Sequence, residues 1–342
     1  MEANRILRGD ALAVLRTLPD GCVNCCVTSP PYFGLRDYGV DGQIGLEETP
    51  EAYTVRLTGV FREVRRVLVK DGTLWIVIAD SYAGSGKGRN ADGRHCIDGS
   101  KSGSYREQTD GIIGKQRAGC KTKDMLGIPW MLAFALRDDG WYLRSDIIWH
   151  KPNNMPHSVT DRPVNTYEHL FLLAKTPKYY FDYHALEVPT SEDTKRRVKR
   201  GFNAGKYAAG APGQAPQTIN QAIAPTADVP AMRRGRDVWS VPTAPYKGAH
   251  FAAYPLELVK PCILAGCPEG GIVIDPFFGS GTTGAAALAL GRRYLGIELN
   301  PEYITLAGER LEQCTSPETP RGMEQSGCGA VFIEGGENTG KG

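Results

Sequence analysis

The hydrophobic pattern of residues 5–82 alternates between the spacing of helices and that of strands. Residues 5–18 (RILRGDALAVLRTL) lead into a helix, whereas residues 23–28 (VNCCVT) form the short apolar run of a buried strand. Residues 51–68 have helical spacing, set by Val55, Val60, Val64 and Val67. Residues 71–80 (DGTLWIVIAD) predict a turn and then a fully buried strand. This alternation predicts an α/β fold with a doubly wound, mostly parallel sheet.

Two glycine-rich, basic stretches interrupt this pattern. Residues 83–124 hold nine glycines, with nine Lys/Arg against five Asp/Glu and no sustained apolar period, which is typical of a long loop. Residues 185–247 are rich in Gly, Pro and Ala, with ten Lys/Arg against five Asp/Glu. Between them, we expect an apolar helix at residues 128–140 and apolar strands at residues 143–151 and 168–175.

Composition and charge narrow the class of protein. The chain has 342 residues and is 41% hydrophobic, so it can form one large core or one core with an inserted subdomain. Its formal net charge is only +2, so any attraction to nucleic acid must come from local basic patches. Neither a signal-peptide pattern nor an apolar run of about 18 residues occurs, which predicts a soluble cytoplasmic protein with no membrane partner.

The cysteines do not form a recognisable metal or disulfide pattern. Nine cysteines, an odd number, argue against a secreted disulfide framework. Cys22 and Cys25 form a CxxC with Cys26 beside them, but a second pair at ligand spacing is missing, because four residues separate Cys262 from Cys267. We therefore expect small buried side chains here and no metal site.

Candidate cofactor-binding residues lie at residues 270–304. This segment contains a strand, a glycine-bearing turn, a helix rich in Ala and Leu, and a second strand that ends at Glu298. Gly279 and Gly281 allow the backbone to approach a ligand, and helix N–H groups beyond Gly281 can meet a polar or anionic group. Glu298 lies seventeen residues past Gly281, about where an acidic side chain holds ribose hydroxyls. These features predict a cofactor that contains adenosine.

The residues before the glycines separate two kinds of cofactor. Dinucleotide folds show GxGxxG, whereas GSGTTG follows Asp275, Pro276 and two phenylalanines here. A carboxylate and an aromatic face favour the sulfonium of S-adenosylmethionine, whereas a carboxylate repels a diphosphate. We therefore expect S-adenosylmethionine, although a GxG alone is also typical of an ordinary strand-to-helix turn.

Three motifs resemble those of a known family. TSPPY at residues 28–32, DPFFGSGTT at residues 275–283 and GIELN at residues 296–300 resemble the amino-methyltransferases of DNA. These are the N4-cytosine and N6-adenine enzymes of the beta class, in which the catalytic motif precedes the cofactor motif. The similarity covers most of residues 5–312 and implies a Rossmann-like fold that binds S-adenosylmethionine.

The resemblance implies a catalytic corner formed by Ser29, Pro30, Pro31 and Tyr32. An exocyclic amino group attacks a sulfonium methyl poorly, because its lone pair is delocalised into the ring. Acceptors at the Ser29 hydroxyl and the Pro30 carbonyl would draw the nitrogen towards tetrahedral geometry. The prolines would aim that carbonyl, and Tyr32 would stack on a flipped base. No cysteine adjoins the prolines, which disfavours methylation of cytosine C5.

Serine in place of aspartate at the first position of this tetrapeptide is associated in the family mainly with N4-cytosine, so we prefer cytosine and keep adenine open. Asp80 ends a predicted strand, where it would orient Ser29, accept a base proton, or cap the following loop. His250 and Phe251 resemble a family segment that folds back along the methionine portion of the cofactor. The expected cofactor-binding residues are Asp275, Phe277, Gly279, Ser280, Gly281, Thr282, Thr283, Glu298, Asn300, His250 and Phe251.

The resemblance also divides the chain into parts. We expect a catalytic part at residues 1–184, an insert that recognises the target at residues 185–247, a cofactor-binding part at residues 248–313 and a flexible tail at residues 314–342. Basic residues of the insert would neutralise phosphates of double-stranded DNA and read guanine edges, although a charge run is also typical of a solvated face. The expected DNA-binding residues are Lys195, Arg196, Arg197, Arg200, Arg233, Arg234 and Arg236.

Other functions and partners stay open at this stage. An RNA-directed or small-molecule methyltransferase, a catalytically silent DNA-binding module and a nicotinamide-dependent Rossmann enzyme are alternatives. The long basic inserts argue against a small substrate, and the intact motifs argue against a silent module. The resemblance further suggests a cognate restriction endonuclease as a partner and a homodimer.

Overall fold

The computed structural model describes residues 2–35, 37–83, 120–154, 159–200, 231–243 and 254–315. The chain divides into two units, which are described separately. Unit 1 comprises Met1–Asp182 and Arg236–Gly342, and unit 2 comprises Tyr183–Gly235.

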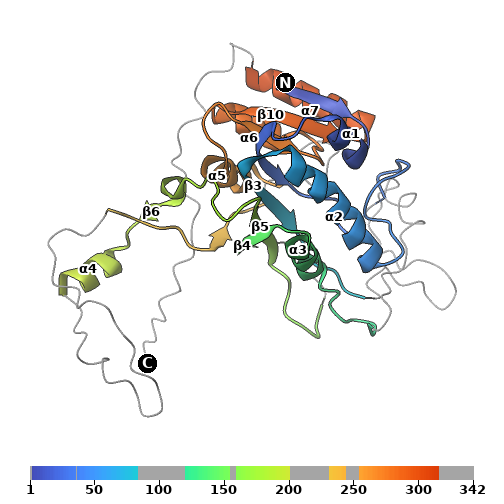
Figure 1. Ribbon diagram of the computed structural model, residues 1–342. Helices are drawn as coiled ribbons and strands as arrows, with labels where there is room; N and C mark the ends of the chain where they lie inside the picture. The colour runs from blue at the N-terminus through green and yellow to red at the C-terminus, as the bar shows by residue number, and fades with distance from the viewer. Residues whose placement is uncertain are drawn as a thin grey trace. The chain divides into compact units, whose positions relative to one another are not determined.

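Unit 1 is built on an eight-stranded sheet (Figure 1). In chain order its strands are β1 (Arg5–Arg8), β2 (Val23–Thr28), β3 (Leu68–Ile78), β4 (Tyr142–His150), β5 (Tyr167–Ala174), β8 (Val238–Ser240), β9 (Ile272–Asp275) and β10 (Arg293–Glu298). In space they lie in the order β1-β10-β9-β2-β3-β5-β4-β8. All neighbours from β1 to β3 are parallel, and β8 is parallel to β4, whereas β5 is antiparallel to both β3 and β4. The predicted mostly parallel α/β sheet is confirmed.

Helices cover both faces of this sheet (Figure 1). They are α1 (Ala11–Thr17), α2 (Pro50–Val67), α3 (Ile128–Asp138), α5 (Leu256–Gly266), α6 (Thr282–Ala289) and α7 (Pro301–Thr315). On one face α1 contacts α2 and α2 contacts α3, while on the other α5 contacts α6 and α6 contacts α7. Because consecutive parallel strands are joined by helices, the sheet is covered on both sides and most residues of its central strands are buried.

Helix α2 shows why the sequence forms these elements. The Thr49 hydroxyl accepts a hydrogen bond from the Ala52 N–H at 3.1 Å, and Pro50 occupies the first turn, where its missing N–H costs nothing. The helix buries Leu57, Phe61 and Val64 against the sheet. The prediction that Val55 belongs to the apolar face of this helix is wrong, because Val55 is 72% exposed and lies on the face opposite the core.

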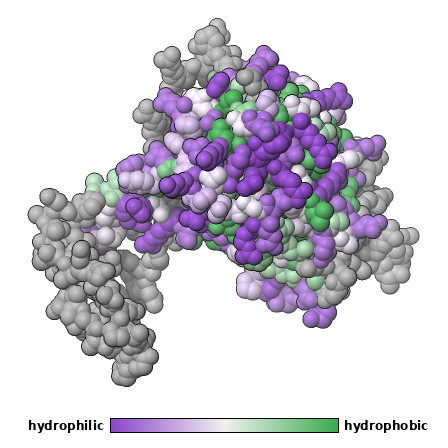
Figure 2. All heavy atoms as spheres, viewed as in Figure 1, coloured by the Kyte–Doolittle hydropathy of each residue, from purple (hydrophilic) through white to green (hydrophobic). Residues whose placement is uncertain are grey.

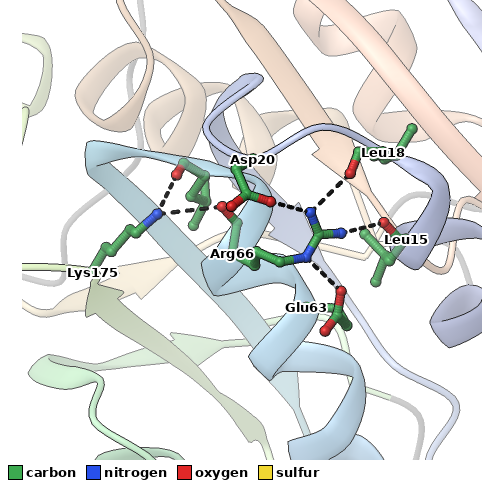
Figure 3. Close-up of polar contacts among 7 residues, drawn as sticks. Leu15, Leu18, Asp20, Glu63, Arg66 and Lys175 are labelled. Atoms are coloured by element: carbon green, nitrogen blue, oxygen red, sulfur yellow. Dashed lines mark hydrogen bonds and ion pairs between the residues drawn. The ribbon is translucent and has the colours of Figure 1, made fainter.

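Arg66, in the last turn of α2, ties α1 to this layer (Figure 3). Its guanidinium donates hydrogen bonds to the carbonyls of Leu15 and Leu18, each at 2.8 Å, at the C-terminal end of α1. It also forms ion pairs with Asp20 and Glu63. The Leu15 carbonyl also accepts the Leu18 N–H at 3.0 Å, so Arg66 is a second donor there, and a cation at this end of the helix suits the helix dipole.

The face shown in Figure 2 is mostly hydrophilic, with hydrophobic residues in small separate groups. Among the helices of the described ranges, none combines the length and the apolar character that a membrane crossing requires.

Unit 2 contains little regular structure in its described residues, 183–200 and 231–235. A 3-10 turn (Tyr183–Leu186) precedes β6 (Val188–Pro189), which pairs antiparallel with β7 (Met232–Arg233). Helix α4 (Glu192–Arg200) follows β6 and begins after Ser191, whose hydroxyl accepts the Thr194 N–H at 3.3 Å. Its sequence EDTKRRVKR places acidic residues in the first turn and basic residues after them, as the helix dipole favours.

Candidate active site

A cavity of about 520 Å³ lies at the carboxyl ends of three adjacent strands, β10, β9 and β2. Residues 29–32 follow β2, residues 276–280 follow β9, and Glu298 ends β10; all of them line the cavity. Parallel strands end at the same edge of a sheet, so segments that are about 250 residues apart in the chain meet here. The two motifs therefore share one cavity.

Asp275, at the end of β9, fastens these segments together beneath the cavity. It is 1% exposed, and its carboxylate accepts hydrogen bonds from the hydroxyls of Thr28 at 2.6 Å, Thr283 at 2.7 Å and Tyr254 at 3.0 Å. Burial raises the pKa of Asp275, while these bonds act in the opposite direction. The expectation that Asp275 faces a cationic group is not met in this structure, because its carboxylate is turned to these internal partners and does not line the cavity.

The turn after β9 forms one wall of the cavity. Gly279 and Gly281 have φ values of +50° and +78°, which suit glycine. A Cβ at Gly281 would also approach the Cβ of Ala307 to 3.1 Å. Arg310 holds the turn from α7 by donating to the Thr282 hydroxyl at 2.9 Å and to the Ser280 carbonyl at 3.3 Å.

Glu298 faces the cavity from the end of β10. Its carboxylate accepts the Gly279 N–H at 2.7 Å and the Asn300 N–H at 2.8 Å, one on each oxygen. Burial raises the pKa of Glu298, and these backbone bonds counteract that rise. Since each carboxylate oxygen can accept two hydrogen bonds, both oxygens retain capacity for hydroxyls of a ligand.

The corner after β2 forms the opposite wall. The Tyr53 hydroxyl donates to the Pro31 carbonyl at 2.8 Å and so fixes the path of the chain. None of the described residues donates a hydrogen bond to the Pro30 carbonyl. The Ser29 hydroxyl lies 3.4 Å from the Tyr32 hydroxyl, which in turn donates to Glu168 at 2.6 Å.

Lys151 and Glu168 line the cavity beside Tyr32, and sequence reasoning did not select them. Lys151 follows β4, its ammonium contacts the Glu168 carboxylate, and it lies 4.3 Å from the centre of the Trp149 ring. Glu168 lies near the start of β5. Because β5 is the antiparallel strand, its beginning lies at the edge where the parallel strands end. Glu168 could therefore have been placed at the cavity from the sequence only if the direction of β5 had been known.

Asp80 corrects another expectation. Its carboxylate accepts the N–H groups of Ser81 at 2.8 Å and of Gly127 and Ile128 at 3.0 Å each. Burial raises its pKa, and the three bonds oppose that effect. Asp80 does not line the cavity. It accepts the Ser81 N–H in the following loop, which is the capping role that the sequence left open, and it also binds the first N–H groups of α3, which the sequence did not predict.

The remaining expected cofactor residues fall into three groups. Phe277, Gly279, Ser280, Thr282, Glu298 and Asn300 line the cavity. Gly281 and Thr283 support it from behind, as Asp275 does. His250 and Phe251 lie outside the described residues.

The expected DNA-binding residues belong to both units. Within unit 2, Lys195 pairs with Glu192 on α4 at 2.6 Å, Arg196 is exposed, and the Arg234 guanidinium lies 5.2 Å from the centre of the Tyr183 ring. Arg233 belongs to β7, and Arg236 is an exposed residue of unit 1. Arg197 and Arg200 belong to α4, but their side chains lie outside the described part of the chain.

Comparisons with known proteins show that this chain is similar to DNA methylases. The family model described as "DNA methylase" matches residues 23–309. The chain is 45% identical to the type II methyltransferase M.XycI of Xanthomonas campestris pv. cyanopsidis, over 91% of this chain and 89% of that protein. It is 42% identical to the type II methyltransferase M.SmaI of Serratia marcescens, over 90% of each.

Solved structures share the fold. A putative DNA modification methylase of Thermus thermophilus, TTHA0409, in complex with S-adenosyl-L-methionine, is 25% identical, with a TM-score of 0.54 and coverage of 92% of this chain and 95% of that chain. The cytosine-N4-specific PvuII DNA methyltransferase aligns with a TM-score of 0.56 at 15% identity, over 92% of each chain.

The sheet and its cavity define a Rossmann-like methyltransferase. The chain belongs to the N6/N4 DNA methylase family; it is a DNA amino-methyltransferase, and S-adenosylmethionine is its methyl donor. The cavity fits this cofactor, because a carboxylate with spare acceptor capacity, a glycine turn of positive φ and the Phe277 ring face the same space.

Proposed function

We propose that this enzyme methylates the exocyclic N4 amino group of cytosine in double-stranded DNA, on a base that is flipped out of the helix. The observation that carries this proposal is that the Ser29–Tyr32 corner and the Glu298 wall line one cavity of about 520 Å³. A base held at one wall and a methyl donor held at the other would meet there. A base inside a duplex cannot reach such a cavity without flipping.

The chemistry assigned to the corner is that of hydrogen-bond acceptors. The Ser29 hydroxyl and the Pro30 carbonyl would accept the two amino hydrogens of the base, which localises the lone pair of the nitrogen. Two prolines restrict the backbone, so the Pro30 carbonyl is held in place before the base arrives. The ring of Tyr32 would stack on the base and replace part of the stacking lost on flipping.

The opposite wall is assigned to the cofactor. Glu298 would accept the ribose hydroxyls, while Phe277, Asn300 and the backbone at Gly279 would complete the cradle. When bound, S-adenosylmethionine supplies an electrophilic methyl group on its sulfonium. These residues orient the donor and exclude water from the cavity.

The choice of cytosine depends on Ser29. Serine at this position of the tetrapeptide, in place of aspartate, is associated in the family mainly with N4-cytosine methylation. Both cytosine and adenine present an amino group beside a ring nitrogen acceptor, so N6-adenine is the alternative. Incubation of duplex DNA with the enzyme, followed by nucleoside digestion and mass spectrometry, separates N4-methylcytosine from N6-methyladenine. Recovery of N6-methyladenine alone would contradict the proposal.

Two substitutions test the division of labour between the walls. Ser29→Ala removes an acceptor for the amino group and should lower the rate of methyl transfer about a hundredfold with little change in cofactor affinity. Gly281→Val forces a branched side chain into a position of φ +78° beside Ala307 and should instead weaken cofactor binding, by about tenfold or more. Single-turnover kinetics and calorimetric titration measure the two quantities. An equal loss of cofactor affinity in both variants would refute the assignment.

A further inference from the structure

A chain of hydrogen bonds connects the catalytic corner to an ion pair that no motif includes. The Ser29 hydroxyl contacts the Tyr32 hydroxyl at 3.4 Å, and the Tyr32 hydroxyl contacts Glu168 Oε2 at 2.6 Å. The other oxygen of Glu168 contacts the Lys151 ammonium. All four side chains line the cavity, and those of Glu168 and Lys151 are 13% and 16% exposed. The network is thus part of the pocket wall and largely shielded from water.

The chemistry of these groups fixes the direction of each bond. An ionised carboxylate can only accept hydrogen bonds, and a phenol has one hydrogen to donate. Tyr32 must therefore donate to Glu168, which leaves its oxygen as an acceptor towards Ser29. The single hydrogen of Ser29 is then directed to Tyr32, and the lone pairs of the Ser29 oxygen are left for another donor.

Two features maintain this direction of the hydrogen bonds. The Lys151 ammonium contacts the second oxygen of Glu168 and holds the carboxylate in this position. Burial and the Glu168 charge raise the pKa of Tyr32 well above its usual value, so the phenol keeps its proton. Tyr32 therefore stays the donor of the bond to Glu168.

We propose that Glu168, held by Lys151, is a positioning residue that acts through Tyr32 to present the Ser29 oxygen as an acceptor for the amino group of the target base. This inference rests on the proposed function and adds the side chains that orient the Ser29 hydroxyl. Without it, the Ser29 hydroxyl could turn its hydrogen towards the base and compete with the amino hydrogens. The ion pair also holds the Tyr32 ring in place for stacking.

A double-mutant cycle on Tyr32→Phe and Glu168→Gln tests the proposal. Tyr32→Phe keeps the ring and removes the relay, whereas Glu168→Gln keeps the size and introduces a group that can donate to Tyr32 and reverse the chain. We expect each variant to lower the single-turnover rate about tenfold at saturating DNA and cofactor. The double variant should be no slower than the slower single variant, because both changes interrupt one pathway.

Controls separate this role from a general loss of structure. Glu257→Gln makes the same substitution in an exposed pair, 2.8 Å from Lys260 on α5, and should leave the rate unchanged. Glu168→Asp keeps an acceptor-only group and should be faster than Glu168→Gln; if the latter does not fold, the cycle is run with Glu168→Asp. The dissociation constant for S-adenosylmethionine should change less than about twofold in Tyr32→Phe and Glu168→Gln, since the chain touches the base side of the cavity.

Two results would overturn the inference. In the first, the rate losses of Tyr32→Phe and Glu168→Gln multiply in the double variant, which would mean that Glu168 acts independently of Tyr32. In the second, Glu168→Gln raises KM for DNA while the maximal rate is unchanged, which would make Glu168 a DNA-binding residue. Failure of the proposed function looks different, because the unaltered enzyme would then yield no N4-methylcytosine.

Discussion

At the scale of single residues, Asp275 connects the segments around the cavity through its hydrogen bonds. It receives three hydroxyl hydrogens and, at 3.0 Å, the Phe277 N–H, and it is almost fully buried. A buried carboxylate is costly unless each of its oxygens is satisfied, and here the hydrogen bonds compensate its desolvation. The same bonds connect β2 to the turn that follows β9, so the geometry of both walls depends on one side chain.

Substitution of Asp275 tests this role. Asp275→Ala leaves the Thr28 and Thr283 hydroxyls buried without their acceptor and should lower the free energy of unfolding by about 3 kcal/mol. Asp275→Asn should cost less, because its amide oxygen can still accept from Thr28, and its amide hydrogens can meet the hydroxyl oxygens of Thr283 and Tyr254. Urea unfolding measures both. Equal losses for Ala and Asn would show that the hydrogen bonds are not what Asp275 contributes.

Glu298 gives the second prediction at this scale, a dependence of cofactor binding on pH. Burial raises its pKa above the usual value for glutamate, so it takes up a proton at a higher pH than an exposed glutamate does. Only the ionised carboxylate offers acceptors on both oxygens, and bound ribose hydroxyls would favour that form. Affinity for S-adenosylmethionine should therefore be constant at neutral pH and fall as the pH falls through the raised pKa.

Calorimetric titration across the weakly acidic range provides the measurement. Glu298→Gln serves as the control, because it cannot titrate: its affinity should be lower at neutral pH, and its acidic decline should be absent. A decline of equal size in Glu298→Gln would assign the effect to another group.

At the scale of elements, α1 is short and depends on its neighbour. Seven residues form too little internal structure for stability in isolation, and the carbonyls at its C-terminal end are bound by Arg66 of α2. Arg66→Met keeps the aliphatic contacts but removes the donors, and it should lower the free energy of unfolding by about 1–3 kcal/mol.

Arg62→Met is the matched control on the same helix. Arg62 pairs with Asp139, but its side chain is 64% exposed, and an exposed ion pair contributes little to stability. Thermal melting of the two variants should show a clear decrease in Tm for Arg66→Met and almost none for Arg62→Met. The reverse order would mean that the link between α2 and α3 matters more than the link between α2 and α1.

The pattern of apolar positions predicted most elements of unit 1, and its errors have physical causes. Residues 272–274 are apolar throughout, and residues 23–28 are apolar except for Asn24 and Thr28, because both faces of a parallel strand are covered. Residues 5–8 (RILR) were not recognised as a strand, because β1 is an edge strand with two arginines in four residues. The reversal of β5 was also missed, since periodicity carries no information on strand direction.

At the scale of the whole molecule, the same limits decide how much of the candidate site could be predicted. Ser29 and Glu298 were found because Ser29 follows, and Glu298 ends, a recognisable parallel strand at a motif. Glu168 was not found, because its place in the cavity depends on the antiparallel direction of β5, and Lys151 was not found, because it follows β4 outside any motif. The donors that bind the Asp275 and Asp80 carboxylates from distant segments could not be predicted from the sequence either, because such hydrogen bonds exist only once the fold is complete.

The DNA contacts expected of the basic insert at residues 185–247, part of which belongs to unit 2, lead to the last prediction. Arg196 on α4 and Arg234 after β7 are exposed cations of this unit, in a chain whose net charge is only +2. If each neutralises a phosphate, Arg196→Gln and Arg234→Gln should each weaken DNA binding and reduce the slope of log K against log salt concentration by about 1. Affinity for S-adenosylmethionine should stay unchanged, because the residues assigned to the cofactor all belong to unit 1.

Arg16→Gln, at an exposed position of α1 in unit 1, is the control for a simple change of net charge. It should leave the salt slope unaltered, because counterion release depends on direct phosphate contacts and not on overall charge. Fluorescence anisotropy of labelled duplex DNA at several salt concentrations measures all three variants. A weakened affinity without a change in slope would mean that Arg196 and Arg234 bind bases and not the backbone. An equal change in Arg16→Gln would contradict the prediction, because the salt dependence would then reflect overall charge and not phosphate contacts of Arg196 and Arg234.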